Sequence, residues 1–284
     1  MKQNKTKIGF FGTPEYAVIT LNKLMKAGYD ISFVITQPDK PRGRKMILTS
    51  SPVKIYAKKN NIPVWEPESL KDFGLASELK KYNCDVFIVI GYGKIIPEKI
   101  LDIPKYKSLN IHGSLLPYLR GPSPIENAIL HDIRETGGTI IKMDKEMDHG
   151  PIISMKKVII ENWPIKANDL RNKIVEETSD LLISILPDWI EGKIKEVPQD
   201  HSQATFTKKI IKEDGLIDLT NDPYKNYLKI NAYHEWPGTF FFKDGKRIKI
   251  TEVIYKDGKL EIIKVIPEGK KKMNYKDFIS KNPL

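Results

Sequence analysis

The chain has 284 residues, of which 40% are hydrophobic and 29% are charged. This composition excludes a disordered chain, and no apolar run approaches the roughly 18 residues that a membrane helix requires. The single cysteine, Cys84, excludes an internal disulfide and a thiolate zinc site, so we expect a cytoplasmic protein without a bound metal. The net charge of +11 favours a polyanionic partner, or it serves solubility.

Short apolar runs alternate with helical stretches through the first half of the chain. Residues 8–12 predict a buried strand that ends in a glycine turn, and a helix is expected over 16–26. Residues 31–36, 84–90 and 108–112 predict further strands, and the nearly continuous apolar character of 84–90 is typical of a strand covered on both faces. This alternation predicts a Rossmann-like α/β fold with an open, mostly parallel sheet.

The pattern changes near residue 190, where a long helix predicted over 166–189 ends. A polar stretch over 191–203 predicts a linker. Beyond it, short β-rich segments are separated by two Asp-Gly turns, which predict hairpins. We therefore expect a larger α/β domain over 1–190 and a small C-terminal β-barrel domain over 204–284.

The glycine turn after the first strand is the first candidate site. A dinucleotide-binding fold carries G-x-G-x-x-G at this point, whereas this chain has Gly9 and Gly12 without the other glycines. Pro14 also removes an amide that could bind phosphate. These features argue against a nicotinamide dehydrogenase and favour a tight turn at Gly12.

Asn110 and His112 are the second candidate. Two residues apart in a strand, their side chains point to the same face. An amide donor beside an imidazole suits acyl transfer through an oxyanion. The alternative is a histidine that is hydrogen-bonded in a loop. The turn at Gly113 and the prolines that follow favour a shaped loop at the end of a strand, where open α/β sheets bind ligands.

The turn formed by Asp148, His149 and Gly150 is the third candidate. It could direct a carboxylate back toward the end of the sheet. A solvated turn aspartate is the alternative, since Asp before Gly is common in turns.

Taken together, three segments resemble the folate-dependent formyltransferases. They are Gly12-Thr13-Pro14-Glu15-Tyr16-Ala17-Val18, Asn110-Ile111-His112-Gly113-Ser114-Leu115-Leu116-Pro117 with Arg120-Gly121, and Glu135-Thr136-Gly137 running to Met147-Asp148-His149-Gly150-Pro151. Three further segments, at 37–45, 204–218 and 231–238, are similar to those of the family members that act on an aminoacylated tRNA. The chain departs from the family pattern at Gly138, usually an apolar residue, and at His149, usually Thr.

The resemblance implies transfer of a formyl group from 10-formyltetrahydrofolate to the α-amino group of methionyl initiator tRNA, for translation initiation. It implies a monomer that binds no membrane. Asn110, His112 and Asp148 match the catalytic trio of the family. Asn110 and a protonated His112 would stabilise the formyl oxygen, while Asp148 would orient His112 and relay a proton through water. The resemblance leaves the division of roles between His112 and Asp148 open.

The resemblance also implies two binding surfaces. The folate would lie against two loops, and the tRNA would contact a basic loop. Gly91 and Gly93 could equally be plain turn residues, although glycines would let a flat pterin reach backbone amides. The implied folate-binding residues are Ile90, Gly91, Tyr92, Gly93, Ser114, Leu115, Leu116 and Pro117, and the implied tRNA-binding residues are Lys40, Arg42, Arg44 and Lys45.

The basic residues are concentrated in two parts of the chain. Residues 39–59 hold seven Lys and Arg against one acidic residue, and residues 201–284 hold seventeen against eleven. The rest of the chain is nearly neutral. This concentration suits contact with an RNA backbone and predicts salt-sensitive binding, with a solvated lysine face as the alternative for the C-terminal lysines.

Three other functions remain to be weighed. A formyltransferase that acts on an amino sugar nucleotide would share the trio but should lack the loop around Arg42. A glycinamide ribonucleotide formyltransferase would have no C-terminal β domain. A non-catalytic RNA-binding protein is hard to reconcile with the presence of Asn110, His112 and Asp148 together.

Overall fold

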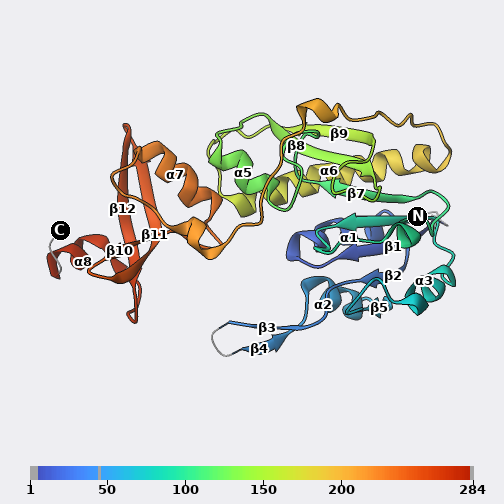
Figure 1. The fold of residues 1–284 in the computed structure, drawn as a ribbon, viewed down its shortest axis with the longest axis horizontal. Helices are drawn as coiled ribbons and strands as arrows, with labels where there is room; N and C mark the ends of the chain where they lie inside the picture. Colours follow the sequence, from blue (N-terminus) through green and yellow to red (C-terminus); the bar gives the residue numbers. More distant parts are fainter. Residues whose placement is uncertain (1–5, 44–45, 282–284) are drawn as a thin grey trace. The chain divides into compact units, whose positions relative to one another are not determined.

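The computed structural model describes residues 6–43 and 46–281, which form two compact units (Figure 1). Unit 1 comprises the chain up to residue 122 together with 136–158 and 172–206. Unit 2 comprises 123–135, 159–171 and the chain from 207 onward. The domain boundaries expected from the sequence stay a prediction. No helix in the described part of the chain is long and apolar enough to cross a membrane.

Unit 1 is built on a seven-stranded sheet in the order β5-β2-β1-β6-β7-β8-β9. The first five strands in this order are parallel, whereas β8 runs antiparallel to β7 and β9 antiparallel to β8. The predicted open, mostly parallel sheet is confirmed. The strands are β1 (Lys7–Gly12), β2 (Asp30–Ile35), β5 (Val64–Trp65), β6 (Val86–Ile90), β7 (Ser108–His112), β8 (Thr136–Lys142) and β9 (Ile152–Val158).

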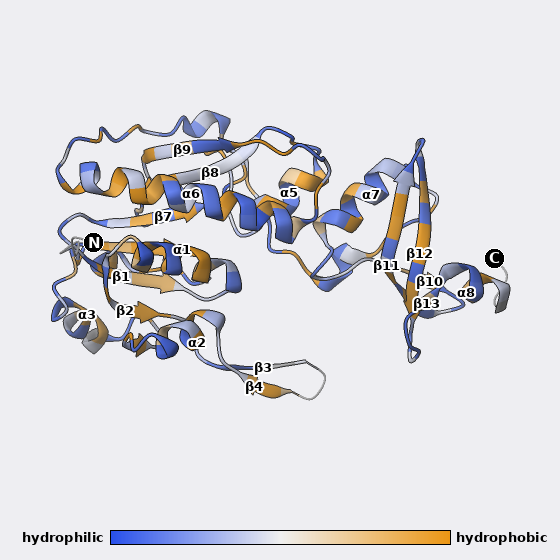
Figure 2. Ribbon diagram, turned by 180° about the vertical axis from the view of Figure 1, so that it is seen from behind, coloured by the Kyte–Doolittle hydropathy of each residue, from blue (hydrophilic) through white to orange (hydrophobic). Residues whose placement is uncertain are grey.

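Helices cover both faces of this sheet, which explains the continuous apolar runs in its strands (Figure 2). Two neighbouring residues of β1 point to opposite faces of the sheet. Phe10 packs with α1, α2 and α6, whereas Phe11 packs with α3 and α4. Cys84, just before β6, is buried, and burial raises the pKa of its thiol to about 12. The helices are α1 (Glu15–Lys26), α2 (Pro52–Lys59), α3 (Phe73–Lys80), α4 (Glu98–Leu101) and α6 (Ala167–Ile190).

A two-stranded hairpin extends from unit 1 beyond α2 (Figures 1 and 2). It consists of β3 (Lys40–Arg42) and β4 (Ile47–Thr49), and it lies in the basic segment singled out in the sequence. Met46, Ile47 and Leu48 are exposed there. The short 3₁₀ helix η1 (His201–Gln203) follows later in the same unit.

Unit 2 contains a four-stranded antiparallel sheet in the order β10-β11-β12-β13, so the predicted small β domain is confirmed. Within the described residues β10 and β13 are the two ends of this sheet and do not pair with each other, so the sheet does not close into the expected barrel. The elements are α5 (Pro124–Leu130), η2 (Lys212–Gly215), α7 (Pro223–Ala232), β10 (Phe240–Lys243), β11 (Lys246–Lys256), β12 (Lys259–Pro267), β13 (Met273–Asn274) and α8 (Tyr275–Lys281).

Both Asp-Gly turns of unit 2 have the conformation expected of tight hairpins. Asp244 and Gly245 have φ angles of 49° and 71°, and Asp257 and Gly258 have φ angles of 49° and 74°. Two successive positive φ angles match the right-handed twist of the flanking strands, which is why Asp-Gly predicts a two-residue turn.

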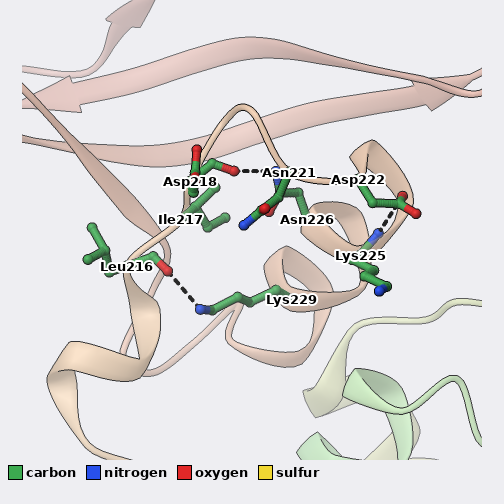
Figure 3. Close-up of a pocket in the computed structure, with 8 residues that line it drawn as sticks. All are labelled: Leu216, Ile217, Asp218, Asn221, Asp222, Lys225, Asn226 and Lys229. Carbon is green, nitrogen blue, oxygen red and sulfur yellow. Dashed lines mark hydrogen bonds between the residues drawn. The ribbon is translucent and has the colours of Figure 1, made fainter.

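A pocket of about 480 Å³ lies between α7 and the segment that precedes it in unit 2 (Figure 3). Two of its polar side chains bond to backbone carbonyls, since Lys229 donates to the carbonyl of Leu216 and Asn226 donates to that of Asp218. Asp222 caps the start of α7. None of the eight lining residues is a site residue predicted from the sequence.

Candidate active site

The end of β7 presents Asn110 and His112 on one face of the strand. Leu109 and Ile111, which alternate with them, belong to the hydrophobic core of the sheet. His112 is buried, whereas Asn110 is half-buried. The alternation of a strand therefore places an amide and an imidazole side by side, as the sequence predicts.

Asp148 joins them from the turn that follows β8. Its Oδ1 atom lies 3.5 Å from Nδ1 of His112 and accepts a hydrogen bond of 3.4 Å from Nδ2 of Asn110. Its Oδ2 accepts a hydrogen bond of 2.8 Å from the backbone N–H of Gly121. The side chain of Asp148 is only 12% exposed, so this carboxylate faces inward and is not a solvated turn residue.

The contacts of His112 fix the position of one ring proton. Nε2 lies 2.9 Å from the carbonyl oxygen of Leu119. Because a carbonyl oxygen only accepts, Nε2 carries a proton and Nδ1 is the nitrogen that can gain or lose one. When protonated, Nδ1 faces the carboxylate of Asp148, which stabilises the charged ring.

The loop over Ser114–Pro117 is held by a residue that the sequence analysis missed. The hydroxyl of Thr139 in β8 donates to the carbonyl of Ser114 at 2.7 Å and accepts from the N–H of Leu116 at 3.1 Å. Thr139 is the residue paired with His112 across the two strands. Only this long-range pairing identifies Thr139, since nothing in its local sequence distinguishes it.

The loop after β6 has a backbone that requires glycine. Gly91 and Gly93 have φ angles of 58° and 81°, and a Cβ on Gly91 would collide with the hydroxyl of Tyr16. The carbonyl of Tyr92 accepts hydrogen bonds from Thr13 and from Nε2 of Gln37. Burial raises the pKa of the Tyr92 hydroxyl to about 12. The turn geometry alone thus explains both glycines, and their contact with folate stays a prediction.

The eight predicted folate-binding residues fall into two groups. Four are buried and shape the loops, whereas the other four reach the surface. The buried residues are Ile90, Tyr92, Ser114 and Leu116, and the others are Gly91, Gly93, Leu115 and Pro117.

Two of the predicted tRNA-binding residues, Lys40 and Arg42, lie in strand β3 of the hairpin. Nζ of Lys40 donates to Oε1 of Gln37 at 2.7 Å, and the backbone of Arg42 pairs with Ile47. Arg44 and Lys45 lie outside the described residues.

Comparison with known proteins shows the family to which the chain belongs. Residues 6–186 match the formyl transferase family, and residues 209–258 match the formyl transferase C-terminal domain. The chain is 40% identical over 248 residues to a methionyl-tRNA formyltransferase from Sulfurihydrogenibium sp. (strain YO3AOP1), covering 87% of this chain and 79% of that protein. This chain belongs to the formyl transferase family.

Other formyl transferases resemble this chain over nearly its full length. A methionyl-tRNA formyltransferase from Dictyoglomus thermophilum is 37% identical over an aligned length of 312 residues, covering 96% of each chain. Among solved structures, a methionyl-tRNA formyltransferase from Clostridium thermocellum has a TM-score of 0.61 at 18% identity, covering 92% of this chain and 98% of its own. A 4-N formyltransferase from Francisella tularensis has a TM-score of 0.67 at 19% identity, and the match covers 88% of this chain and 98% of that one. These two structures support the formyl transferase fold.

Proposed function

We propose that this protein transfers the formyl group of 10-formyltetrahydrofolate to the α-amino group of methionyl initiator tRNA, in the cytoplasm where translation begins. The observation that carries the proposal is the convergence of Asn110 and His112 on Asp148. Nδ2 of Asn110 and Nδ1 of His112 lie 3.4 and 3.5 Å from Oδ1 of Asp148. The relatives named methionyl-tRNA formyltransferase, at 34–41% identity, support tRNA as the acceptor.

The trio supplies what the reaction needs at the formyl oxygen. As the amine nitrogen bonds to the formyl carbon, negative charge develops on that oxygen. Nδ2 of Asn110 and a protonated Nδ1 of His112 can donate to it, and such preorganised donors lower the barrier. The oxyanion then re-forms the C=O double bond as the bond from the formyl carbon to the donor nitrogen breaks. The donor nitrogen keeps the electron pair of that bond and takes up a proton, which balances the proton lost by the attacking amine.

Asp148 has two roles in this scheme. Its Oδ1 stabilises the charged ring of His112, and its carboxylate can accept, through a water molecule, the proton that leaves the attacking amine. The N–H of Gly121 holds the other oxygen, so the carboxylate keeps its orientation while the proton moves.

The formyl donor fits the two loops at the ends of β6 and β7. Gly91 is half-buried and Gly93 is exposed, so a flat ring could reach the backbone of this loop, and the half-buried Leu115 and Pro117 offer apolar contact. Thr139 maintains the shape of the second loop. Thus the four surface residues of the predicted eight would touch the donor, while the buried four would support them.

The proposed tRNA-binding hairpin starts next to the donor loop. Gln37 bonds to Lys40 through its Oε1 and to the carbonyl of Tyr92 through its Nε2. This link ties the base of the β3–β4 hairpin to the loop that carries Gly91 and Gly93. An acceptor stem held by Lys40, Arg42, Arg44 and Lys45 would therefore arrive beside the formyl donor.

An assay with paired acceptors tests the proposal. The protein is supplied with 10-formyltetrahydrofolate and either methionyl initiator tRNA or an amino sugar nucleotide, with uncharged tRNA as the control. We expect N-formylmethionyl-tRNA and no formylated sugar. A formylated sugar nucleotide without any formylmethionyl-tRNA would show that the chain is a sugar formyltransferase. No product in either arm would support the non-catalytic RNA-binding alternative.

A further inference from the structure

The segment Leu119-Arg120-Gly121 contacts two members of the catalytic trio at once. The carbonyl of Leu119 accepts from His112, and the N–H of Gly121 donates to Asp148. Arg120, between them, is 3% exposed. A displacement of this segment would therefore change the position of His112 and of Asp148 together.

Arg120 is held by Gln199, a residue of the stretch that the sequence predicts as a linker. Nε and Nη2 of Arg120 donate to Oε1 of Gln199 at 3.1 and 2.6 Å. Nη2 of Arg120 also lies 2.9 Å from Nδ1 of His201. Gln199 is itself buried.

The orientation of the Gln199 amide follows from these contacts. Arginine only donates, so the atom of Gln199 that faces Arg120 is the oxygen. The NH₂ group then points the other way, and Nε2 donates to the carbonyls of Asp148 and Gly150 at 3.0 and 2.7 Å. Both amide hydrogens are thus used, one on each side of His149.

The backbone held by Gln199 has a conformation that the local sequence does not favour. Asp148 has a φ angle of 53°, in the left-handed region that residues other than glycine seldom adopt. Gly150 leaves no room for a side chain, since a Cβ there would collide with the carbonyl of Lys142. A turn of this kind persists only where its surroundings hold it.

We propose that Gln199 and Arg120 are positioning residues for formyl transfer, which close a loop of hydrogen bonds from the backbone of Asp148 to its carboxylate. The path runs from the Asp148 carbonyl through Gln199 and Arg120 to the neighbouring N–H of Gly121, and so to Asp148 Oδ2. It holds the carboxylate against His112. This inference rests on the proposed function.

Replacement of Gln199 by residues of similar size tests the amide itself. Gln199→Met fills the space without hydrogen bonds, and Gln199→Glu keeps the acceptor for Arg120 but turns an oxygen toward two carbonyls. We expect both to lower kcat by about 10–100-fold, because a small misplacement of a catalytic group is costly. KM for each substrate should change less than about threefold. Unfolding temperatures identify any variant that does not fold, in which case the other variant decides.

Gln203 provides the matched control. It is an exposed glutamine of the same stretch, and its side chain bonds to Tyr118 and Asp200 but not to the Asp148 turn. Gln203→Ala should keep kcat within about twofold of the original protein, as surface substitutions usually do. An equal loss in Gln203→Ala and Gln199→Met would overturn the proposal.

A double-mutant cycle separates positioning from a general structural effect. If Gln199 acts through the Asp148 carboxylate, Gln199→Met should lower kcat by less than about threefold when Asp148→Asn is already present. If kcat of the double variant instead fell by the product of the two single-variant losses, the proposal would be overturned.

A spectroscopic measurement tests the proposal without an activity assay. The amide proton of Gly121 donates to a carboxylate, and such protons resonate downfield. In Gln199→Met this resonance should move upfield, whereas in Gln203→Ala it should stay. An unmoved resonance overturns the proposal. If the original protein transfers no formyl group, the proposed function fails and the Gly121 resonance alone decides the role of Gln199.

Discussion

The ring of His149 stacks on the ring of His201, with centroids 4.1 Å apart and an interplanar angle of 3°. Nδ1 of His149 lies 2.7 Å from a carboxylate oxygen of Asp144, and Nδ1 of His201 accepts from Arg120. The pair therefore lies between an acidic and a basic side chain, directly beside Asp148. A threonine at position 149 has no ring and could not form this stack with His201.

Replacement of His149 by Thr should affect stability more than chemistry. The loss of a stacked pair costs on the order of 1 kcal/mol, which lowers the unfolding temperature by roughly 2–4 °C in a chain of this size. The backbone at 148–150 stays held by Gln199, so kcat should fall by less than about threefold. Thermal unfolding and initial rates measure both effects. Met147→Ala, an exposed side chain of the same turn, is the control and should change neither.

Removal of any trio side chain should abolish most of the activity. We expect Asn110→Ala, His112→Ala and Asp148→Asn each to lower kcat by about 10²-fold or more, since each removes a donor or a charge at the reacting atoms. His131→Ala, an exposed histidine after α5, should retain full activity in the same assay. Near-normal rates in the trio variants would refute the proposed site.

The stability of the hairpin base should depend on pH through Asp39. Nζ of Lys54 lies 2.8 Å from Asp39 and from Glu66. The hydrogen bond from Lys54 holds the pKa of Asp39 below its usual value. A carboxylate with a lowered folded pKa contributes stability above its unfolded pKa, about 3.9, and loses that contribution as the pH falls through the folded value.

Lys54→Met should therefore lower the unfolding temperature by a few degrees at pH 7, and by progressively less toward pH 3. Unfolding curves of the original protein and the variant across this range measure the difference. Lys58→Met, an exposed lysine of the same helix, should show no such trend. If the difference in unfolding temperature between the original protein and Lys54→Met stayed constant from pH 7 to pH 3, the proposed role of Asp39 would be wrong.

Gly138 should not tolerate alanine. A Cβ there would collide with the hydroxyl of Thr178 in α6, because the helix packs directly on β8. We expect Gly138→Ala to cost about 1–3 kcal/mol of unfolding free energy, and Thr178→Ala to recover part of it. Gly74→Ala is the matched control, since a Cβ there meets only Asp72 Oδ1 at an ordinary contact distance of 3.7 Å and the backbone is helical, so it should be neutral or stabilising by up to about 1 kcal/mol. Denaturant unfolding of the four proteins distinguishes these outcomes.

Lys40 should contribute to the salt dependence of tRNA binding. If it contacts one phosphate, Lys40→Gln should weaken binding and reduce the slope of log Kd against log salt by about 0.7–0.9. Titrations at several salt concentrations measure the slope. Lys81→Gln, at the end of α3, should leave the slope unchanged. An unchanged slope in Lys40→Gln would remove Lys40 from the proposed interface.

The local features of this protein were determined by its sequence. Alternation along a strand placed Asn110 beside His112, and the Asp-Gly pairs fixed the two hairpin turns of unit 2. Each of these features depends on residues that are neighbours in the chain, so periodicity and turn chemistry are enough to predict them.

The tertiary structure decided the rest. It brought Asp148 to His112, paired Thr139 with the same strand, and placed Gln199 of the predicted linker against the catalytic turn. Over the part of the chain that the structure describes, it also left the four-stranded sheet of unit 2 open, where the sequence predicted a barrel. These outcomes depend on contacts between segments far apart in the chain. No local pattern encodes such contacts, because their energies arise from packing and hydrogen bonds formed only when the whole chain folds.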